Sequence, residues 1–333
     1  MNKMKIAVIG AGAIGGLVAA YLHKAGQNVI LVGREDQVAA IKKNGLSISG
    51  INGNENFKLK AAARLDQEYD LVIFSTKTQD LEQAYAENCE YLEDCLVLTT
   101  QNGVQADNIL SVHFERDRMF SSIVMFGATY VKPGEIVYNF KGDWILGSPF
   151  VPVNDKLKEI AAIFQNAFSV VVSEHIMGMK YLKLFVNFNN CICALVGKSM
   201  QETFADLDMC KLSIRLLKEG VDIVKNAKIE LASLPDYPVE RIYGLTSMPE
   251  DQAAGIMNKV LTGLSKEPLY GSILQSIMRG KPSEIDFING EVVFLGKQMH
   301  RSIVLNERVV EMVHEVEHTK KFFSFEDVKK LLV

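Results

Sequence analysis

The chain has 333 residues, of which 48% are hydrophobic, and a formal net charge of -4. This length suffices for two domains with substantial cores, and no apolar run approaches the length of a membrane span. Acidic and basic side chains are interspersed without a basic stripe, so we expect neither a nucleic-acid nor a membrane partner.

The cysteines predict a reducing environment. They are five in number, an odd count, and form no C-x-x-C pair. We therefore expect thiols that are mostly buried as small hydrophobic groups. The first strand begins at Lys5, too early to follow a signal peptide, so we expect a cytoplasmic protein.

The first segment predicts a dinucleotide-binding fold. Lys5–Ile9 is a β-branched run typical of a buried strand, Leu17–Leu22 is apolar and helical, and Asn28–Val32 is a second strand. Between the first strand and the helix, the spacing G-x-G-x-x-G is provided by Gly10, Gly12 and Gly15. Strand, glycine loop, helix and strand follow in the order that pyrophosphate binding requires.

The helix amino terminus would hold the phosphates of the cofactor through its exposed N–H groups. We predict that the cofactor contacts Gly10, Gly12, Ala13, Ile14 and Gly15. Arg34 follows the second strand, where a guanidinium suits a ribose 2′-phosphate, so we favour NADPH. Glu35 and Asp36 leave open the alternative that a carboxylate binds the 2′-hydroxyl of NADH.

Further strands should bring more polar residues to the same edge of the sheet. Tyr69–Ser75 predicts a buried strand followed by Lys77 and Gln79, and Leu96–Thr100 predicts one followed by Asn102. Ligands of doubly wound sheets bind outside the carboxyl ends of the strands, so we expect these three side chains to line the cofactor site. Other predicted elements are helices at Gln37–Asn44, Asp80–Leu92 and Asp155–Ala167, polar strands across Gly45–Lys60, several strands across Met119–Gly147, and a strand at Ser169–Ser173.

Beyond Ser173 the pattern becomes almost wholly helical. We therefore predict an α/β chain, with a Rossmann-type NADPH-binding domain at residues 1–173 and an all-α substrate and catalytic domain at residues 174–333. The predicted helices are Met177–Val196, Met200–Ile229, Pro249–Leu264, Ser272–Arg279, Ser283–Met299 and Asn306–Lys321.

One predicted helix carries polar side chains in an apolar setting. Lys183 and Asn187 are four residues apart and share a face, and Asn190 continues the same stripe. Buried polar groups need a partner or a ligand, which makes these residues site candidates. Farther along, Ser283 suits a helix N-cap and Glu284 the first turn, a pattern that by itself identifies no site.

The chain resembles the ketopantoate reductase (2-dehydropantoate 2-reductase) family of NADPH-dependent enzymes. The similarity spans residues 6–290 and rests on the GAGAIGG loop at Gly10–Gly16, Gly33-Arg34, Thr76–Gln79, Gln101–Gly103, Lys183–Asn187, Ser272–Gln275 and Glu284–Gly290. The resemblance implies that Lys183 is the general acid and that Glu284 orients groups in the site. It further implies that Arg34, Gln79 and Lys77 serve the cofactor and that Asn102, Asn187 and Ser272 hold a 2-oxo acid substrate.

One position departs from the family pattern. Members commonly have a second asparagine eight residues after the lysine, where this chain has Cys191. Asn190 lies about 100° round the helix from Cys191. We therefore expect Asn190 to replace the missing asparagine in part, as a substrate-binding residue. With the long stretch Leu231–Pro268, this departure keeps open a reductase of a different branched 2-oxo acid. A non-catalytic NADPH-binding protein on the same scaffold is a separate alternative. A homodimer is also open.

The sequence His314-Glu315-Val316-Glu317-His318 matches the zinc-binding pattern H-E-x-x-H. A catalytic zinc site also needs a third protein ligand, and none follows in this densely charged segment. We therefore predict a solvated helix face and no metal.

Overall fold

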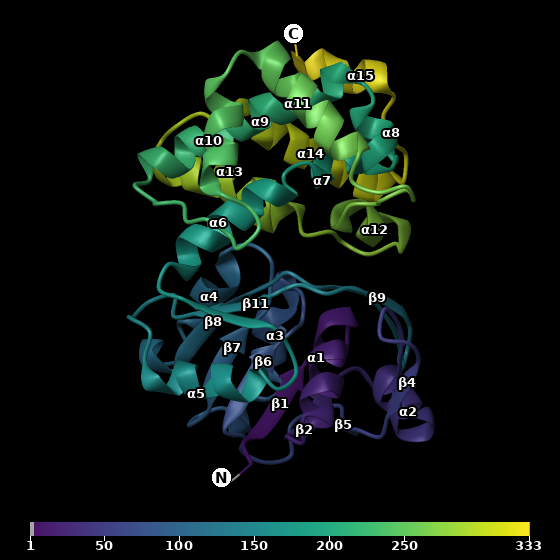
Figure 1. Ribbon diagram of the computed structural model, residues 1–333, viewed down its shortest axis with the longest axis vertical. Coiled ribbons are helices and arrows are strands. Elements are labelled where there is room, and N and C mark those ends of the chain that lie inside the picture. The colour runs from purple at the N-terminus through teal and green to yellow at the C-terminus, as the bar shows by residue number, and fades with distance from the viewer. Residues whose placement is uncertain (1–2, 333) are drawn as a thin grey trace. The chain divides into compact units, whose positions relative to one another are not determined.

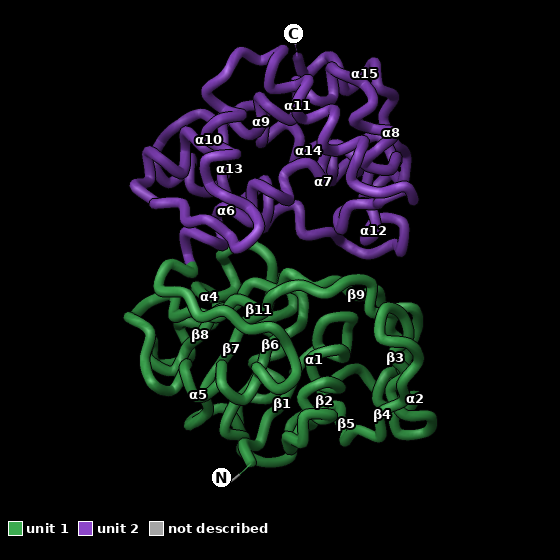
Figure 2. The backbone as a smooth tube through the Cα atoms, in the orientation of Figure 1, with its two compact units in different colours: residues 1–176 green, residues 177–333 purple. Residues whose placement is uncertain are grey.

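The computed structural model describes residues 3–332. These residues divide into two compact units, the first ending at Ile176 and the second beginning at Met177 (Figure 2). The boundary predicted at Ser173 lies three residues before this division. Each unit has a fold of its own class, α/β in the first and helical in the second, as the sequence predicts (Figure 1).

Within the described residues, the first unit contains an eight-stranded sheet in the order β12-β11-β8-β7-β6-β1-β2-β5. All neighbouring strands are parallel except β8 and β11, which are antiparallel. The strands are β1 (Lys5–Ile9), β2 (Asn28–Val32), β5 (Lys60–Ala62), β6 (Leu71–Phe74), β7 (Leu96–Thr99), β8 (Met119–Val124), β11 (Trp144–Gly147) and β12 (Val170–Ser173). The strand order reverses at β1, since β2 pairs with one edge of this strand and β6 with the other. Sheets of this kind bind nucleotides at such a reversal.

A second sheet accounts for the polar strands of the sequence. It has the order β4-β3-β10-β9 and contains β3 (Leu46–Gly50), β4 (Glu55–Phe57), β9 (Gly127–Lys132) and β10 (Glu135–Phe140). The helices of this unit are α1 (Ala13–Lys24), α2 (Glu35–Asn44), α3 (Leu81–Ala86), α4 (Gln105–Leu110) and α5 (Asp155–Phe164). Short 3-10 turns are η1 (Thr78–Asp80), η2 (Cys89–Tyr91) and η3 (Arg116–Arg118).

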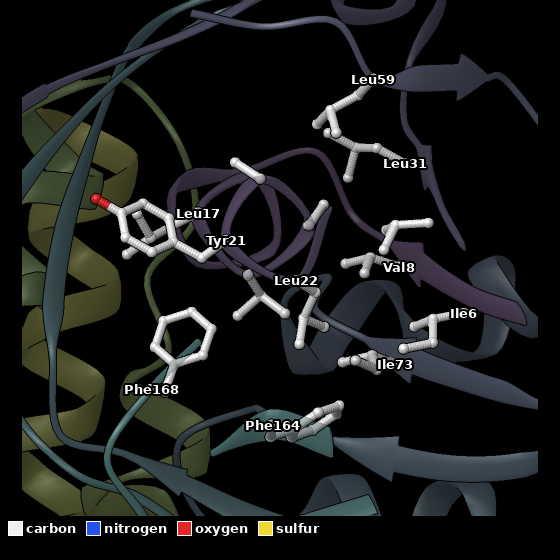
Figure 3. Close-up of a cluster of buried hydrophobic side chains, with 14 of the residues drawn as sticks. Ile6, Val8, Leu17, Tyr21, Leu22, Leu31, Leu59, Ile73, Phe164 and Phe168 are labelled. Carbon is white, nitrogen blue, oxygen red and sulfur yellow. The ribbon is translucent and has the colours of Figure 1, made fainter. Parts of the chain in front are cut away.

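Helix α1 is the centre of the first unit's core. Figure 3 shows Leu17, Tyr21 and Leu22 of this helix beside side chains of the sheet strands, among them Ile6 and Val8. Leu17 and Leu22 have no solvent exposure. Burying one such side chain contributes about 1.5–3 kcal/mol, so this contact fixes the glycine loop that precedes the helix.

The second unit is made of helices, and within residues 3–332 no helix has the length and apolar character needed to cross a membrane. Its longest helix, α9, packs against α11, α13 and α14. The helices are α6 (Ile176–Asn187), α7 (Asn190–Val196), α8 (Met200–Phe204), α9 (Leu207–Asn226), α10 (Val239–Ser247), α11 (Glu250–Thr262), α12 (Ser272–Met278), α13 (Asn289–Gln298), α14 (Val304–Thr319) and α15 (Phe325–Lys329), with 3-10 turns η4 (Ile285–Phe287) and η5 (Lys330–Leu332).

The prediction of unbroken helices at Met177–Val196 and Met200–Ile229 is wrong. After α6 the hydrogen bonds span three residues and no longer four. The Phe188 N–H donates to the Phe185 carbonyl at 3.2 Å, and the Cys191 N–H donates to the Phe188 carbonyl at 3.3 Å. The second break falls at Asp206, whose side chain accepts from the Asp208 N–H at 2.8 Å and begins α9. Both breaks replace α-helical bonds by local alternatives.

Candidate functional site

Two glycines of the loop have no room for a side chain, and the third faces open space. A Cβ on Gly10, whose φ is +117°, would lie 2.6 Å from the Ser75 carbonyl carbon. A Cβ on Gly15 would lie 2.0 Å from the Gly10 oxygen, so this glycine lets α1 approach the loop. At Gly12, the N-cap of α1, an added Cβ would meet nothing within 4 Å. The open Gly12 face, with Ala13 and Ile14 opening the helix, therefore fits a pyrophosphate.

Two hydroxyl groups after β6 also fit a bound ligand. Among the described residues, Thr76 Oγ1 and Thr78 Oγ1 are buried side-chain oxygens without a hydrogen-bond partner. Such atoms are costly unless something satisfies them. They alternate with Lys77, the half-buried N-cap of η1, and Gln79, which is exposed in η1.

Arg34 lies at the end of β2, beside the glycine loop. Its backbone N–H donates to Gln37 Oε1 at 3.0 Å, and Gln37 Nε2 donates to the Ala11 carbonyl at 2.8 Å. The Arg34 side chain is exposed, and its Nε lies 3.6 Å from Asp36 Oδ1. An exposed pair of this kind is weak, so the guanidinium can exchange Asp36 for a phosphate.

Asn102 follows β7 on a loop that is held from behind. The buried Gln101 side chain donates to the carbonyls of Phe74 and Thr76, both at 2.9 Å, and Gly103 turns the chain with a φ of +76°. Asn102 itself is half-buried. The structure thus places the cofactor-binding candidates of the first unit at the carboxyl ends of β1, β2, β6 and β7.

In the second unit, Lys183 and Asn187 lie one turn apart on α6. Burial lowers the pKa of the Lys183 ammonium from its ordinary value of 10.5. Desolvation disfavours the charged form, which makes the proton easier to donate. A lysine in this state is suited to general acid chemistry.

Asn190 lies against Ser272, but the predicted α-helical stripe is not the reason. Helix α6 ends at Asn187 and α7 begins at Asn190, so the predicted stripe is interrupted by a turn between the two helices. Asn190 Nδ2 lies 3.5 Å from Ser272 Oγ as donor to acceptor. A Cβ on Gly271 would come within 2.5 Å of Asn190 Oδ1, so this glycine permits the close approach of α7 and α12.

Cys191 points into the interior of the second unit. It has no solvent exposure, and its Sγ donates to the Phe188 carbonyl at 2.9 Å. Burial raises the pKa of this thiol. With no solvent exposure, Cys191 is a core residue of the second unit, whereas Asn190 beside it lies against Ser272.

The predicted helix over Ser283–Met299 is wrong at its start. Glu284 is the half-buried N-cap of the 3-10 turn η4, and α13 begins only at Asn289. Ser283 Oγ accepts from the Ile285 N–H at 3.3 Å, so Ser283 caps this turn and not an α-helix. Glu284 therefore lies in a short irregular segment between two helices.

The H-E-x-x-H segment lies on α14, and its face is not simply solvated. His314 Nε2 lies 2.9 Å from Asp286 Oδ1 and its Nδ1 lies 3.1 Å from Glu317 Oε2, while His318 is exposed. Across residues 3–332, no group of three or more His, Cys, Asp or Glu side chains could hold a metal ion. The first histidine of the motif is instead engaged by two carboxylates.

Sequence reasoning missed Gln37, the two threonine hydroxyls and Glu317. Gln37 had a signal, since it stands three residues after Arg34, in the N3 position of a capping box. The threonines stand in the Thr76–Gln79 motif and Glu317 in the H-E-x-x-H pattern, but neither pattern predicts what these residues do, because that depends on neighbours distant in sequence.

The fold and these residues define a class, the nicotinamide-dependent oxidoreductases with a Rossmann-type domain followed by a helical domain. The model of the family described as ketopantoate reductase PanE/ApbA matches residues 6–149, and its C-terminal counterpart matches residues 175–317. The chain belongs to the ketopantoate reductase family. This result confirms the resemblance drawn from the motifs.

Individual relatives agree with this family membership. A 2-dehydropantoate 2-reductase of Pyrococcus horikoshii is 28% identical over 309 residues, covering 91% of this chain and 94% of the relative. One from Aquifex aeolicus is 26% identical over 331 residues, covering 97% and 99%. Among solved structures, a D-mandelate dehydrogenase with NADH and anilino(oxo)acetate is 23% identical with a TM-score of 0.82, covering 95% of this chain and 99% of that one. A ketopantoate reductase from Ralstonia eutropha is 24% identical with a TM-score of 0.81 and the same coverage.

Proposed function

We propose that the chain reduces 2-dehydropantoate to pantoate with NADPH. The observation that carries this proposal is a half-buried lysine on α6 whose pKa is lowered by desolvation, with Asn187 one turn farther along the same helix. The matched family and the relatives named 2-dehydropantoate 2-reductase support the substrate. Arg34, exposed beside the glycine loop, supports NADPH over NADH.

Each candidate residue has a role in this reaction. The bound cofactor supplies the hydride to the keto carbon. Lys183 donates a proton from its Nζ to the oxygen that becomes an alkoxide, and Glu284 orients the ammonium. Asn187, Asn190 and Ser272 hold the substrate through their amide and hydroxyl groups, and Asn102 contacts both ligands.

Lys77 is the competing proton donor. It follows β6 directly, in a segment where two buried threonine hydroxyls lack partners among the described residues. We assign this segment to cofactor binding because it belongs to the nucleotide-binding sheet. Lys77 therefore serves NADPH.

A second candidate is reduction of a different branched 2-oxo acid. The sequence features that favour it are Cys191, where the family pattern commonly has an asparagine, and the stretch Leu231–Pro268, which folds into α10 and α11. A non-catalytic NADPH-binding protein is disfavoured, since a sensor needs no half-buried amine whose pKa is lowered by desolvation. We further propose a cytoplasmic location, which is supported by the buried free thiols of Cys95, Cys191, Cys193 and Cys210. A homodimer is the alternative to a monomer.

The proposal is tested by following NADPH oxidation by the purified protein with a panel of 2-oxo acids. We expect 2-dehydropantoate to give the highest kcat/KM and one NADPH to be consumed for each pantoate formed. Faster turnover of another branched 2-oxo acid would favour the second candidate. If the protein binds NADPH but turns over no member of the panel, the proposal that it is an enzyme would be contradicted.

A further inference from the structure

The H-E-x-x-H helix is joined to the segment that carries Glu284. Glu317 Oε1 accepts a hydrogen bond from the Ser283 N–H at 2.6 Å. His314 lies between Glu317 and Asp286, with one ring nitrogen within 3.1 Å of each carboxylate. The two anchored residues, Ser283 and Asp286, flank Glu284 on both sides.

The charge state of His314 bears on the strength of this anchor. Ionised carboxylates only accept hydrogen bonds, so both ring nitrogens donate when the imidazole is protonated. Partial burial would lower the pKa of His314, but the hydrogen bonds and charges of Asp286 and Glu317 outweigh it and raise the pKa. Glu317 has only 15% of its side chain exposed, so its charge-assisted bonds are shielded from water.

The segment between the anchors has few hydrogen bonds of its own, and its one fully buried side chain is Ile285. Glu284 begins a single 3-10 turn, closed by the Phe287 N–H donating to the Glu284 carbonyl at 3.0 Å. A turn of this length is poorly stabilised by its own hydrogen bonds. The position of the Glu284 backbone therefore depends on contacts from outside the turn.

We infer that Glu317, together with His314, is a positioning residue that fixes Glu284 for its part in the reaction. The inference rests on the proposed function, in which Glu284 orients the proton donor. It also gives the zinc-like motif of α14 a role without a metal. Groups in a reactive site must be held to within about 0.5 Å, and such precision comes from supporting hydrogen bonds of this kind.

The test compares Glu317→Ala with Glu317→Gln, and uses His318→Ala as the matched control on the same helix. We expect Glu317→Ala to lower kcat about tenfold, the usual effect of losing one hydrogen bond to a charged group, with the KM for NADPH unchanged. Glu317→Gln should restore most of the rate, because its amide oxygen can still accept from Ser283. His318→Ala should leave kcat unchanged.

A double-mutant cycle shows whether the effect passes through Glu284. In a Glu284→Gln background, Glu317→Ala should cause little further loss, since the group that it positions is already disabled. Equal losses in both backgrounds, or a native kcat in Glu317→Ala, would overturn the inference. If Glu317→Ala does not fold, His314→Ala at a half-exposed position should still lower kcat by about threefold, the size typical of such pairs.

A readout independent of activity separates this inference from the proposed function. Hydrogen exchange at the Ser283–Phe287 amides should be about tenfold faster in Glu317→Ala than in the native protein, because one hydrogen bond to a charged group has been lost. It should be unchanged in His318→Ala. Unchanged exchange in Glu317→Ala would overturn the anchor, whereas failure of the native protein to reduce any 2-oxo acid would refute only the proposed function.

Discussion

Gln37 ties together two parts of the first unit that are distant in sequence. Its side chain accepts from the Arg34 N–H and donates to the Ala11 carbonyl of the glycine loop. Its Nε2 also lies 3.3 Å from the hydroxyl of Tyr130 in β9. Gly33 completes the arrangement, since a Cβ there would come within 2.5 Å of Ala11 Cβ. The location of Arg34 relative to the glycine loop is therefore fixed by one buried amide.

At the residue scale, Arg34→Ala should weaken NADPH binding by about tenfold to a hundredfold, since a hydrogen bond to a charged group contributes about 1.5–3 kcal/mol. NADH binding should change little. Gln37→Ala should shift the same preference in the same direction but by less, because the guanidinium remains. Dissociation constants for both cofactors by fluorescence titration check this, and equal losses for the two cofactors would instead assign the ribose to Glu35 or Asp36.

Cys191→Asn should destabilise the protein instead of restoring a substrate contact. The position has no exposure, so the larger polar side chain would overpack the core at a cost of about 1–3 kcal/mol. Cys89→Asn, at an exposed cysteine, is the matched control and should leave stability unchanged. Urea denaturation measures both. A native midpoint for Cys191→Asn would mean that residue 191 faces the substrate after all.

At the scale of elements, the strands flanking the glycine loop were predictable to the residue, at Lys5–Ile9 and Asn28–Val32. Buried parallel strands and a glycine turn have strong local signals. The break between α6 and α7 was not predictable, because Phe188 and Asn189 include no glycine or proline. It is imposed by tertiary contacts, among them the Asn189 side chain accepting from Ser213 Oγ of α9. The position of Asn190 could therefore be known only from the structure.

The contact between α14 and the η4 segment should make stability depend on pH. The folded-state pKa of His314 is raised, so its ion pairs with Asp286 and Glu317 stabilise the fold fully below the ordinary value of 6.5. This contribution is lost as the pH rises through the raised pKa. His314→Ala should thus lower the free energy of unfolding more at about pH 5.5, below the ordinary pKa, than at about pH 8.5. Urea denaturation at the two pH values checks this, and a loss independent of pH would contradict it.

At the scale of the whole molecule, the two units divide the chemistry. The candidates for cofactor binding lie in the first unit, and the proposed proton donor, Lys183, lies in the second. Damage to one set should therefore affect one kinetic constant. Lys77→Ala should raise the KM for NADPH and leave kcat nearly native, whereas substitution at Lys183 should do the reverse.

The central claim is that Lys183 supplies the proton during reduction of 2-dehydropantoate. The most direct measurement is the steady-state rate of NADPH oxidation with 2-dehydropantoate by the native protein and by Lys183→Ala. General acids contribute about 10²–10⁴-fold, so kcat should fall at least about a hundredfold with NADPH affinity nearly unchanged. A native kcat in Lys183→Ala, with the loss appearing in Lys77→Ala, would contradict the account.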